Sequence, residues 1–267
     1  MSLRTKYSLD AQIGEGGLGV VYQGVRRSDG VPVAIKVVKK ARCNKFTPDG
    51  TPWEVAILAK VQDIPGVVQM LDYYNHADAY YIVMEKFGGG DLFDYILVRG
   101  GLNEDPARKI FKQVLDTTME CYNRGIAHRD IKDENILLDH DTLTTKVIDF
   151  GEATFVRPEK FKKFLGTPEN SPPEWLINRE YTLKGLMPWL LGVLLFTLAS
   201  GQAPFEKTQQ IERMDIDWSL LKGCSPDLQS LVHGCLTRDP CKRMTLQEVS
   251  HCPWVMALAE DADRTQL

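Results

Sequence analysis

Residues 128–135 read His128-Arg129-Asp130-Ile131-Lys132-Asp133-Glu134-Asn135, and the apolar pair Ile136-Leu137 follows directly. This segment places a carboxylate, an ammonium group and a carboxamide within one short loop. About fourteen residues after Asn135 comes a second segment, Asp149-Phe150-Gly151. Each segment alone fits an ordinary polar surface loop. Whether they are functional therefore has to be judged together with the sequence that precedes them.

Upstream, residues 14–19 read Gly14-Glu15-Gly16-Gly17-Leu18-Gly19. Glycines in such a G-x-G-x-x-G pattern let backbone amides approach phosphate oxygens, because no Cβ stands in the way. A glycine-rich hairpin turn and a dinucleotide-binding loop are the other interpretations. A dinucleotide fold needs a helix after the glycines, whereas residues 20–22 (VVY) continue as a strand and residues 33–36 (VAIK) follow. The pattern therefore predicts a hairpin that covers phosphates.

Lys36 stands at the end of this apolar strand. A buried ammonium group needs anionic partners, so we expect it to meet phosphate oxygens and the carboxylate of Glu54. That glutamate follows the helix-start pattern of residues 51–53 (TPW). Without further matches, an edge-strand lysine and a solvated glutamate would explain the two residues equally well.

In this order and spacing, the glycine loop, Lys36, residues 128–135 and residues 149–151 form the protein kinase signature. Over essentially its whole length the sequence resembles a eukaryotic protein kinase, and within that superfamily it is most similar to the PIM kinases of the calmodulin-dependent kinase group. The finer resemblance rests on residues 128–137, with Asp133 in place of a common proline, and on three other segments: 91–96 (DLFDYI), 171–175 (SPPEW) and 251–254 (HCPW).

The resemblance implies a bilobal α+β fold. A small antiparallel β-rich N-lobe with one main helix would span residues 1–86, and a larger, mainly α-helical C-lobe would span residues 87–267, with ATP in the cleft between them. The residues agree: alternating apolar patterns predict strands within residues 8–38, 67–72 and 80–85, and one apolar face predicts a helix between residues 103 and 125. Residues 186–199 predict a buried helix, with Pro188 in its first turn.

The resemblance also assigns roles. Asp130 would orient the substrate hydroxyl and accept its proton, Lys132 would neutralise charge on the transferred phosphoryl group, and Asn135 and Asp149 would hold Mg²⁺. Lys36 and Glu54 would act as a pair. The ATP contacts would come from the glycine loop, the strands around it, the hinge and the floor of the cleft: Ile13, Gly14, Gly16, Gly19, Val21, Ala34, Lys36, Met84, Glu85, Phe87, Asp91 and Leu137.

Some positions depart from patterns that are common in kinases, and others are expected to support the fold. The linker from Lys36 to Glu54 is a few residues shorter than in PIM kinases, so the helix that carries Glu54 is expected to be shorter or displaced. Met187 stands where many kinases have an aspartate that supports the catalytic loop. Outside the ATP cleft, we expect Thr167 to bond to the catalytic loop, and Glu174 to pair with Arg243.

Composition and charge narrow the partners. A formal net charge of -4 argues against nucleic acid, and no segment is long and apolar enough to predict a membrane span. Six cysteines without a Cys-x-x-Cys pair fit a reduced protein of the cytoplasm or nucleus. We expect a monomer that acts on protein substrates with arginine or lysine upstream of the phosphoacceptor, through an acidic surface of Asp91, Asp94, Asp133 and Glu134.

Two further points concern how the activation segment is ordered and whether the chain is catalytically active. Arg129 precedes Asp130, as in kinases that need a phosphorylated activation segment, yet residues 157–165 (RPEKFKKFL) contain no serine, threonine or tyrosine. We therefore expect independence from such phosphorylation, with order supplied by Glu159 or by packing of Phe161 and Phe164; a segment that stays mobile until a partner docks is the alternative. A pseudokinase scaffold is the rival function, which the complete set of catalytic residues disfavours.

Overall fold

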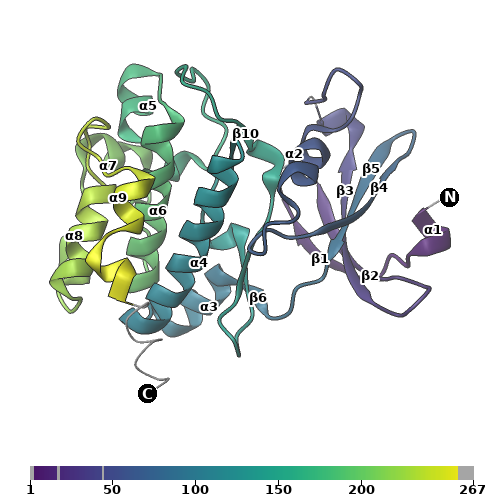
Figure 1. Cartoon of the computed structure of the whole chain (residues 1–267), viewed down its shortest axis with the longest axis horizontal. Coiled ribbons are helices and arrows are strands. Elements are labelled where there is room, and N and C mark those ends of the chain that lie inside the picture. Colours follow the sequence, from purple (N-terminus) through teal and green to yellow (C-terminus); the bar gives the residue numbers. More distant parts are fainter. Residues whose placement is uncertain (1–2, 17–18, 44, 258–267) are drawn as a thin grey trace.

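The structure, a computed structural model, describes residues 3–16, 19–43 and 45–257, and these form the predicted bilobal α+β fold (Figure 1). The N-terminal lobe holds a five-stranded antiparallel sheet in the order β1-β2-β3-β5-β4. Its elements are α1 (Leu3–Lys6), β1 (Gln12–Glu15), β2 (Val20–Val25), β3 (Pro32–Lys39), the 3-10 turn η1 (Lys40–Arg42), α2 (Trp53–Val61), β4 (Met70–Asn75) and β5 (Ala79–Glu85).

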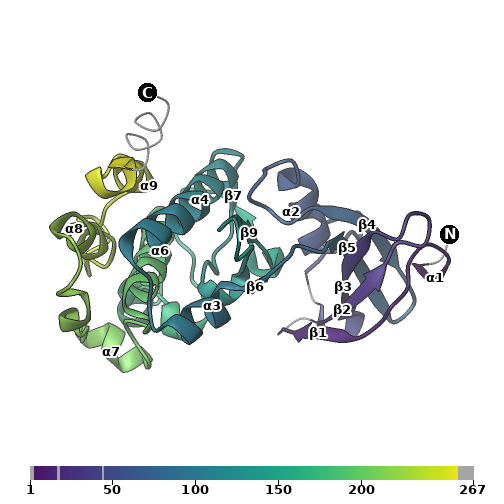
Figure 2. The same ribbon diagram turned by 90° about the horizontal axis from the view of Figure 1, so that it is seen from below.

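The alternation of β3 places its residues on two different faces of this sheet. Val33 and Ile35 pack with Leu3 and Tyr7 of the N-terminal segment on the outer face. Val38 belongs to the main core, which includes α2, and Lys36 shares its face because side chains two apart point the same way. Figure 2 shows α2 between the sheet and the C-terminal lobe. The pleat of one strand thus directs Lys36 toward the space between the lobes.

The C-terminal lobe is mainly helical. Its helices are α3 (Leu92–Arg99), α4 (Glu104–Asn123), α5 (Pro173–Asn178), α6 (Leu183–Ser200), α7 (Thr208–Arg213), α8 (Pro226–Cys235) and α9 (Leu246–Ser250). Short strands and 3-10 turns lie between them and carry the candidate site: β6 (Gly90–Asp91), β7 (Ile126–Ala127), η2 (Asp133–Asn135), β8 (Ile136–Leu138), β9 (Thr145–Val147), η3 (Phe150–Glu152), β10 (Thr154–Phe155), η4 (Pro168–Asn170) and η5 (Trp218–Leu221).

The predicted strand at residues 67–72 is displaced along the chain. β4 begins at Met70 and ends at Asn75, because Val67 and Val68 instead contact the backbone of Val147 in the C-terminal lobe. The last strand of the N-terminal sheet ends at Glu85. The division of the chain at residue 86 stays a prediction.

Helix α6 is the core of the C-terminal lobe, where it packs against α4, α8 and α9. In the described part of the chain it is the one helix whose length and composition would suffice to cross a membrane, but 78% of its apolar window is buried inside the lobe. The prediction that Pro188 lies in its first turn is wrong. The helix begins at Leu183, after the N-cap Thr182, so Pro188 lies inside it and cannot donate a hydrogen bond to Lys184.

Candidate active site

Lys36 is the centre of a buried cluster of charges between the lobes. Its Nζ lies 2.7 and 2.9 Å from the two carboxylate oxygens of Glu54 on α2, and 2.8 Å from Oδ1 of Asp149. Lys36 and Glu54 are only 5% and 4% exposed. The shorter linker therefore does not displace the helix far enough to separate the predicted pair.

The electrostatics of this cluster favour the charged forms of Lys36 and Asp149, while burial raises the pKa of Glu54. Burial lowers the pKa of Lys36, but the carboxylates of Glu54 and Asp149 raise it by more, so the pKa lies above its ordinary value. Burial raises the pKa of Asp149, and the neighbouring Lys36 lowers it by more, so the net shift is downward. At neutral pH the cleft therefore presents an ammonium group beside a carboxylate, as phosphate and metal binding require.

The backbone at Asp149 aims its carboxylate into the cleft. Asp149 has a left-handed backbone with φ 58°, and its side chain caps the turn η3 by accepting from the amide of Gly151. The next residue, Phe150, is fully buried, with its ring 4.7 Å from that of His128. Adjacent residues thus point in opposite directions, one into the cleft and one into the core.

The carboxylate of Asp130 is held from two sides. Thr167 donates to Oδ1 from its amide and its hydroxyl at 2.9 and 3.0 Å, which is the predicted contact with the catalytic loop. The amide nitrogen of Asn135 donates to Oδ2 at 3.0 Å and to the carbonyl of Asp130 at 2.8 Å. Lys132 instead pairs with Glu134, at 2.5 Å. Asp130 is therefore fixed in orientation, while Lys132 would have to leave this carboxylate to take the role that the resemblance gives it.

Asn135 and Asp149 fit the magnesium role that the resemblance gives them. Because Asn135 turns its amide nitrogen to Asp130, its amide oxygen is left to act as a ligand. Asp149 adds a second oxygen ligand. The residues described here contain no group of three or more His, Cys, Asp or Glu side chains that could hold a metal alone. Mg²⁺ suits such a sparse set of oxygens, since it usually keeps waters and substrate phosphates in its shell.

The glycine loop forms a tight hairpin above this cluster. The amide of Gly16 donates to the carbonyl of Gly19 at 2.9 Å, and the reverse bond is 3.3 Å. A Cβ on Gly16 would lie 3.9 Å from Oδ2 of Asp149, so the loop reaches over that carboxylate, and a Cβ on Gly19 would lie 2.4 Å from the carbonyl of Val37. Gly17 and Leu18 of the motif lie outside the described residues.

The predicted adenine contacts lie on both sides of the cleft. Ala34 and Met84 are partners in the register of β3 and β5, and Leu137 lies on β8 of the other lobe. Val21 is half-buried on β2, and Ile13 is 48% exposed on β1. Their roles toward the nucleotide remain predictions.

In the hinge between the lobes (residues 85–88), the carboxylate of Glu85 is engaged outside the predicted ATP site. Glu85 pairs with Lys146 at 2.8 Å, and its amide donates to the carbonyl of Gln69. Phe87 is half-buried. Asp91, predicted to reach a ribose, is the N-cap of α3 and accepts from the amide of Asp94 at 2.8 Å.

Lys146, His128 and Arg129 also shape the site, although the sequence analysis gave no structural role to Lys146 or to His128. Lys146, 9% exposed, connects β9 to the hinge. Nε2 of buried His128 lies 2.9 Å from the carbonyl of Ile148, and its Nδ1 accepts from the amide of Asp130 at 3.3 Å. Burial lowers the pKa of His128, which favours the neutral ring. Arg129, buried with φ 71°, donates to the carbonyl of Glu152 at 2.6 Å. The available signals were the catalytic-loop motif for His128 and Arg129 and, for Lys146, its place in the short strand β9.

Away from the cleft, the predicted ion pair of Glu174 and Arg243 is present. Two guanidinium nitrogens lie 2.9 and 2.8 Å from the two carboxylate oxygens, and Arg243 also donates to the carbonyl of Gly185 at 2.7 Å. Met187 is buried, with 1% of its surface exposed. It packs in the core, so His128 supplies polar support to the catalytic loop that Met187 cannot.

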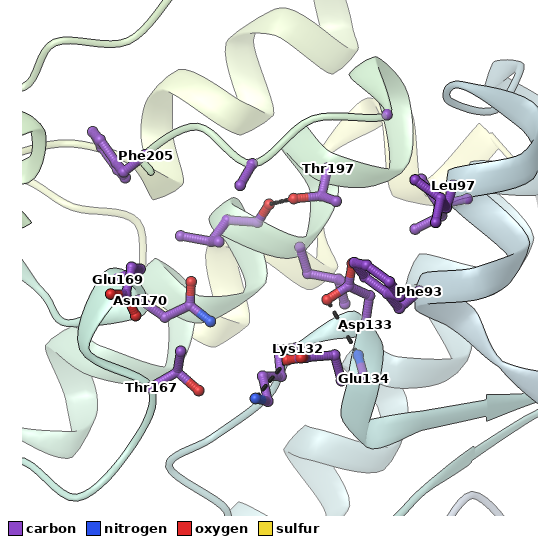
Figure 3. Close-up of a pocket in the computed structure, with 15 residues that line it drawn as sticks. Phe93, Leu97, Lys132, Asp133, Glu134, Thr167, Glu169, Asn170, Thr197 and Phe205 are labelled. Atoms are coloured by element: carbon purple, nitrogen blue, oxygen red, sulfur yellow. Dashed lines mark hydrogen bonds and ion pairs between the residues drawn. The ribbon is translucent and has the colours of Figure 1, made fainter. Parts of the chain in front are cut away.

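A groove of about 310 Å³ lies beside the catalytic loop, and Figure 3 shows the side chains that line it. Its apolar lining includes Phe93 and Leu97 of α3 and Phe205 after α6, while Asp133, Glu134 and Glu169 supply carboxylates. Burial raises the pKa of Asp133, with the neighbouring charge of Glu134 adding to the effect. The lining thus combines apolar surface with three carboxylates, one of which, Glu134, pairs with Lys132.

Comparisons with known proteins agree with this geometry. The family model described as the protein kinase domain matches residues 7–255. The chain is 36% identical over 258 residues to serine/threonine-protein kinase prk-2 of Caenorhabditis elegans and 37% identical over 270 residues to serine/threonine-protein kinase pim-2 of Danio rerio. A human SNF-related serine/threonine-protein kinase is 32% identical over 258 residues.

The chain therefore belongs to the protein kinase family, and it is a serine/threonine kinase domain similar to the PIM kinases. The alignments cover 94%, 96% and 94% of this chain, and 58%, 86% and 34% of the prk-2, pim-2 and SNF-related proteins respectively.

Proposed function

We propose that the protein transfers the γ-phosphate of ATP to serine or threonine hydroxyls in basic sequence contexts, and that it does so without phosphorylation of its activation segment. The main support is the joint arrangement of Lys36 with Glu54 and Asp149, and of Asp130 with Asn135 and Thr167. A pseudokinase would not need both arrangements intact, and no observation favours that alternative.

The chain's own residues act mainly by positioning and by charge. Lys36 would bind the phosphates of ATP while Glu54 keeps its ammonium group in place. Asp130 would accept a hydrogen bond from the substrate hydroxyl and then its proton. Asn135 and Asp149 would hold Mg²⁺, whose charge would help to neutralise the phosphates. Lys132 would move from Glu134 to the transferred phosphoryl group.

The proposed basic context rests on the groove of Figure 3. Its carboxylates attract guanidinium or ammonium groups, and its apolar lining accommodates the aliphatic stem of arginine or lysine. Asp91 and Asp94 of the predicted acidic surface are not among the residues that line this groove, and Asp91 caps α3. The groove carboxylates are Asp133, Glu134 and Glu169. Glu134 pairs with Lys132 in the structure, so it would become available to a basic side chain once Lys132 turns to the phosphoryl group.

Matched peptides test this context. The wild type should phosphorylate a peptide with upstream arginines at higher kcat/KM than the same peptide with upstream alanines. Glu134→Gln and Glu169→Gln should each reduce that ratio by about fivefold, the range of one surface charge pair. Asp227→Asn, an exposed acid on the distant helix α8, is the control. A ratio of one in the wild type would overturn the proposed context.

Independence from phosphorylation rests on the packing of the activation segment. Phe161, 6% exposed, stacks on Tyr181 with ring centroids 5.5 Å apart, and the two backbones are paired. Phe164 contacts Tyr181 and Trp175. Glu159, the other candidate, is exposed. Aromatic packing thus provides the order that a phosphate supplies in other kinases.

A further inference from the structure

The start of helix α2 contacts residues 151–155, which form the start of the activation segment. The indole nitrogen of Trp53, the first residue of α2, donates to the carbonyl of Ala153 at 2.8 Å. The same ring packs edge-on against Phe155 at 5.4 Å. Nζ of Lys45 lies 2.5 Å from a carboxylate oxygen of Glu152 and 3.3 Å from the carbonyl of Gly151.

Within the N-terminal lobe, Trp53 and Lys45 are also connected to each other. The backbone amide of Trp53 donates to the carbonyl of Lys45 at 3.1 Å. Trp53 is also the direct neighbour of Glu54, the partner of Lys36. A shift of the indole away from Ala153 therefore moves the backbone that carries Glu54.

Glu152 connects Lys45 to the catalytic loop. Its carboxylate pairs with Lys45, while its carbonyl accepts from Nε of Arg129 at 2.6 Å. Arg129 is the residue before Asp130. One short segment after Asp149 thus touches both the helix that positions Glu54 and the loop that carries the catalytic carboxylate.

Helix α2 needs such support. It has nine residues, and its N-cap, Pro52, offers no side-chain hydrogen bond. A helix of this length is marginal without tertiary contacts. The hydrogen bond of Trp53 and the ion pair of Lys45 connect the start of the helix to residues 152 and 153.

We infer that Trp53 and Lys45 are positioning residues, which hold α2 against residues 151–153 and so keep Glu54 on Lys36 while the activation segment is unphosphorylated. This inference rests on the proposed function and adds a residue-level cause for activity without phosphorylation. The simpler alternative is that both residues only stabilise the fold.

The test compares unphosphorylated wild type with Trp53→Phe, which keeps a ring but removes the donor, with Lys45→Met, and with the double variant. Each single change should lower kcat/KM for ATP by about fivefold, the effect of one lost hydrogen bond or ion pair, and the double change by more. Lys45→Arg should restore most of the activity. Lys39→Met, at an exposed position on β3, is the control.

Amide hydrogen exchange and the unfolding temperature, each compared with kcat/KM, distinguish a positioning role from a role in stability alone. Amide hydrogen exchange should increase in α2 and in residues 149–155 of the double variant, at temperatures well below its unfolding midpoint. Unchanged kcat/KM in a double variant that unfolds at a lower temperature would overturn the inference and leave the proposed function standing. A wild type that phosphorylates no peptide would instead refute the proposed function itself.

Discussion

The cleft and the activation segment are ordered by different forces. Around Lys36, three charged groups hold one another at hydrogen-bonding distance in a largely buried site. Around Phe161, aromatic rings pack against one another, and the proposed function gives this packing the ordering role that a phosphate has in other kinases. In that proposal the charges of the cleft serve to bind phosphates, whereas the segment around Phe161 has only to keep its position. The comparison predicts that variants in the two regions fail in different ways.

The largest loss should come from the cleft. Lys36→Met removes the ammonium group and leaves Glu54 and Asp149 without their counter-charge. We expect phosphoryl transfer to fall by at least about a thousandfold, because the electrostatic stabilisation of the phosphates is lost. Peptide phosphorylation measures the loss, and circular dichroism should still show a folded protein. Wild-type turnover in this variant would contradict the assignment of the cleft.

A second cleft variant should separate catalysis from nucleotide binding. Asp130→Asn keeps the size of the side chain but cannot accept the proton of the substrate hydroxyl, so kcat should fall by about a hundredfold or more. ATP affinity, measured by calorimetry, should change little because this carboxylate is expected to face the substrate hydroxyl and not the phosphates of ATP. A large loss of ATP affinity with unchanged kcat would show that Asp130 acts elsewhere.

The aromatic packing should fail differently. Phe161→Ala opens a cavity in the stack with Tyr181, at a cost of about 3 kcal/mol if the region cannot collapse. We expect the KM for peptide to rise about tenfold with little change in the KM for ATP, since the part of the segment near Phe161 reaches Asp130 through Thr167, whereas Lys36 is contacted by Asp149 at the other end of the segment. Ile177→Ala, at an exposed residue of α5, is the matched control. Equal losses in both KM values would erase the distinction between the two regions.

What the sequence could predict follows the same division. Lys36, Asp130, Asn135 and Asp149 were recognisable because phosphate chemistry demands fixed residue types at a characteristic spacing. Trp53 and Lys45 were not, because their partners lie about a hundred residues away in the chain and any hydrogen-bonding side chain could serve. Packing of Phe161 was foreseen only as one of two candidates.

The error at Pro188 has a local cause. The apolar run that begins at Leu186 suggested the start of the helix, but Lys184 and Gly185 already belong to its first turn. Thr182 accepts from the amide of Gly185 and so begins the helix earlier. Because the first turn contains Lys184 and Gly185, the start of the helix cannot be recognised from hydrophobicity, although the rest of the helix can.

The central claim is that charges in the cleft and rings in the activation segment together make the unphosphorylated kinase competent. Intact mass spectrometry can establish that the purified enzyme carries no phosphate, and a peptide with upstream arginines can then be added with Mg-ATP. The account predicts product that accumulates linearly from the first time point. A lag that ends only as the enzyme becomes phosphorylated, or a strict need for another kinase, would contradict it.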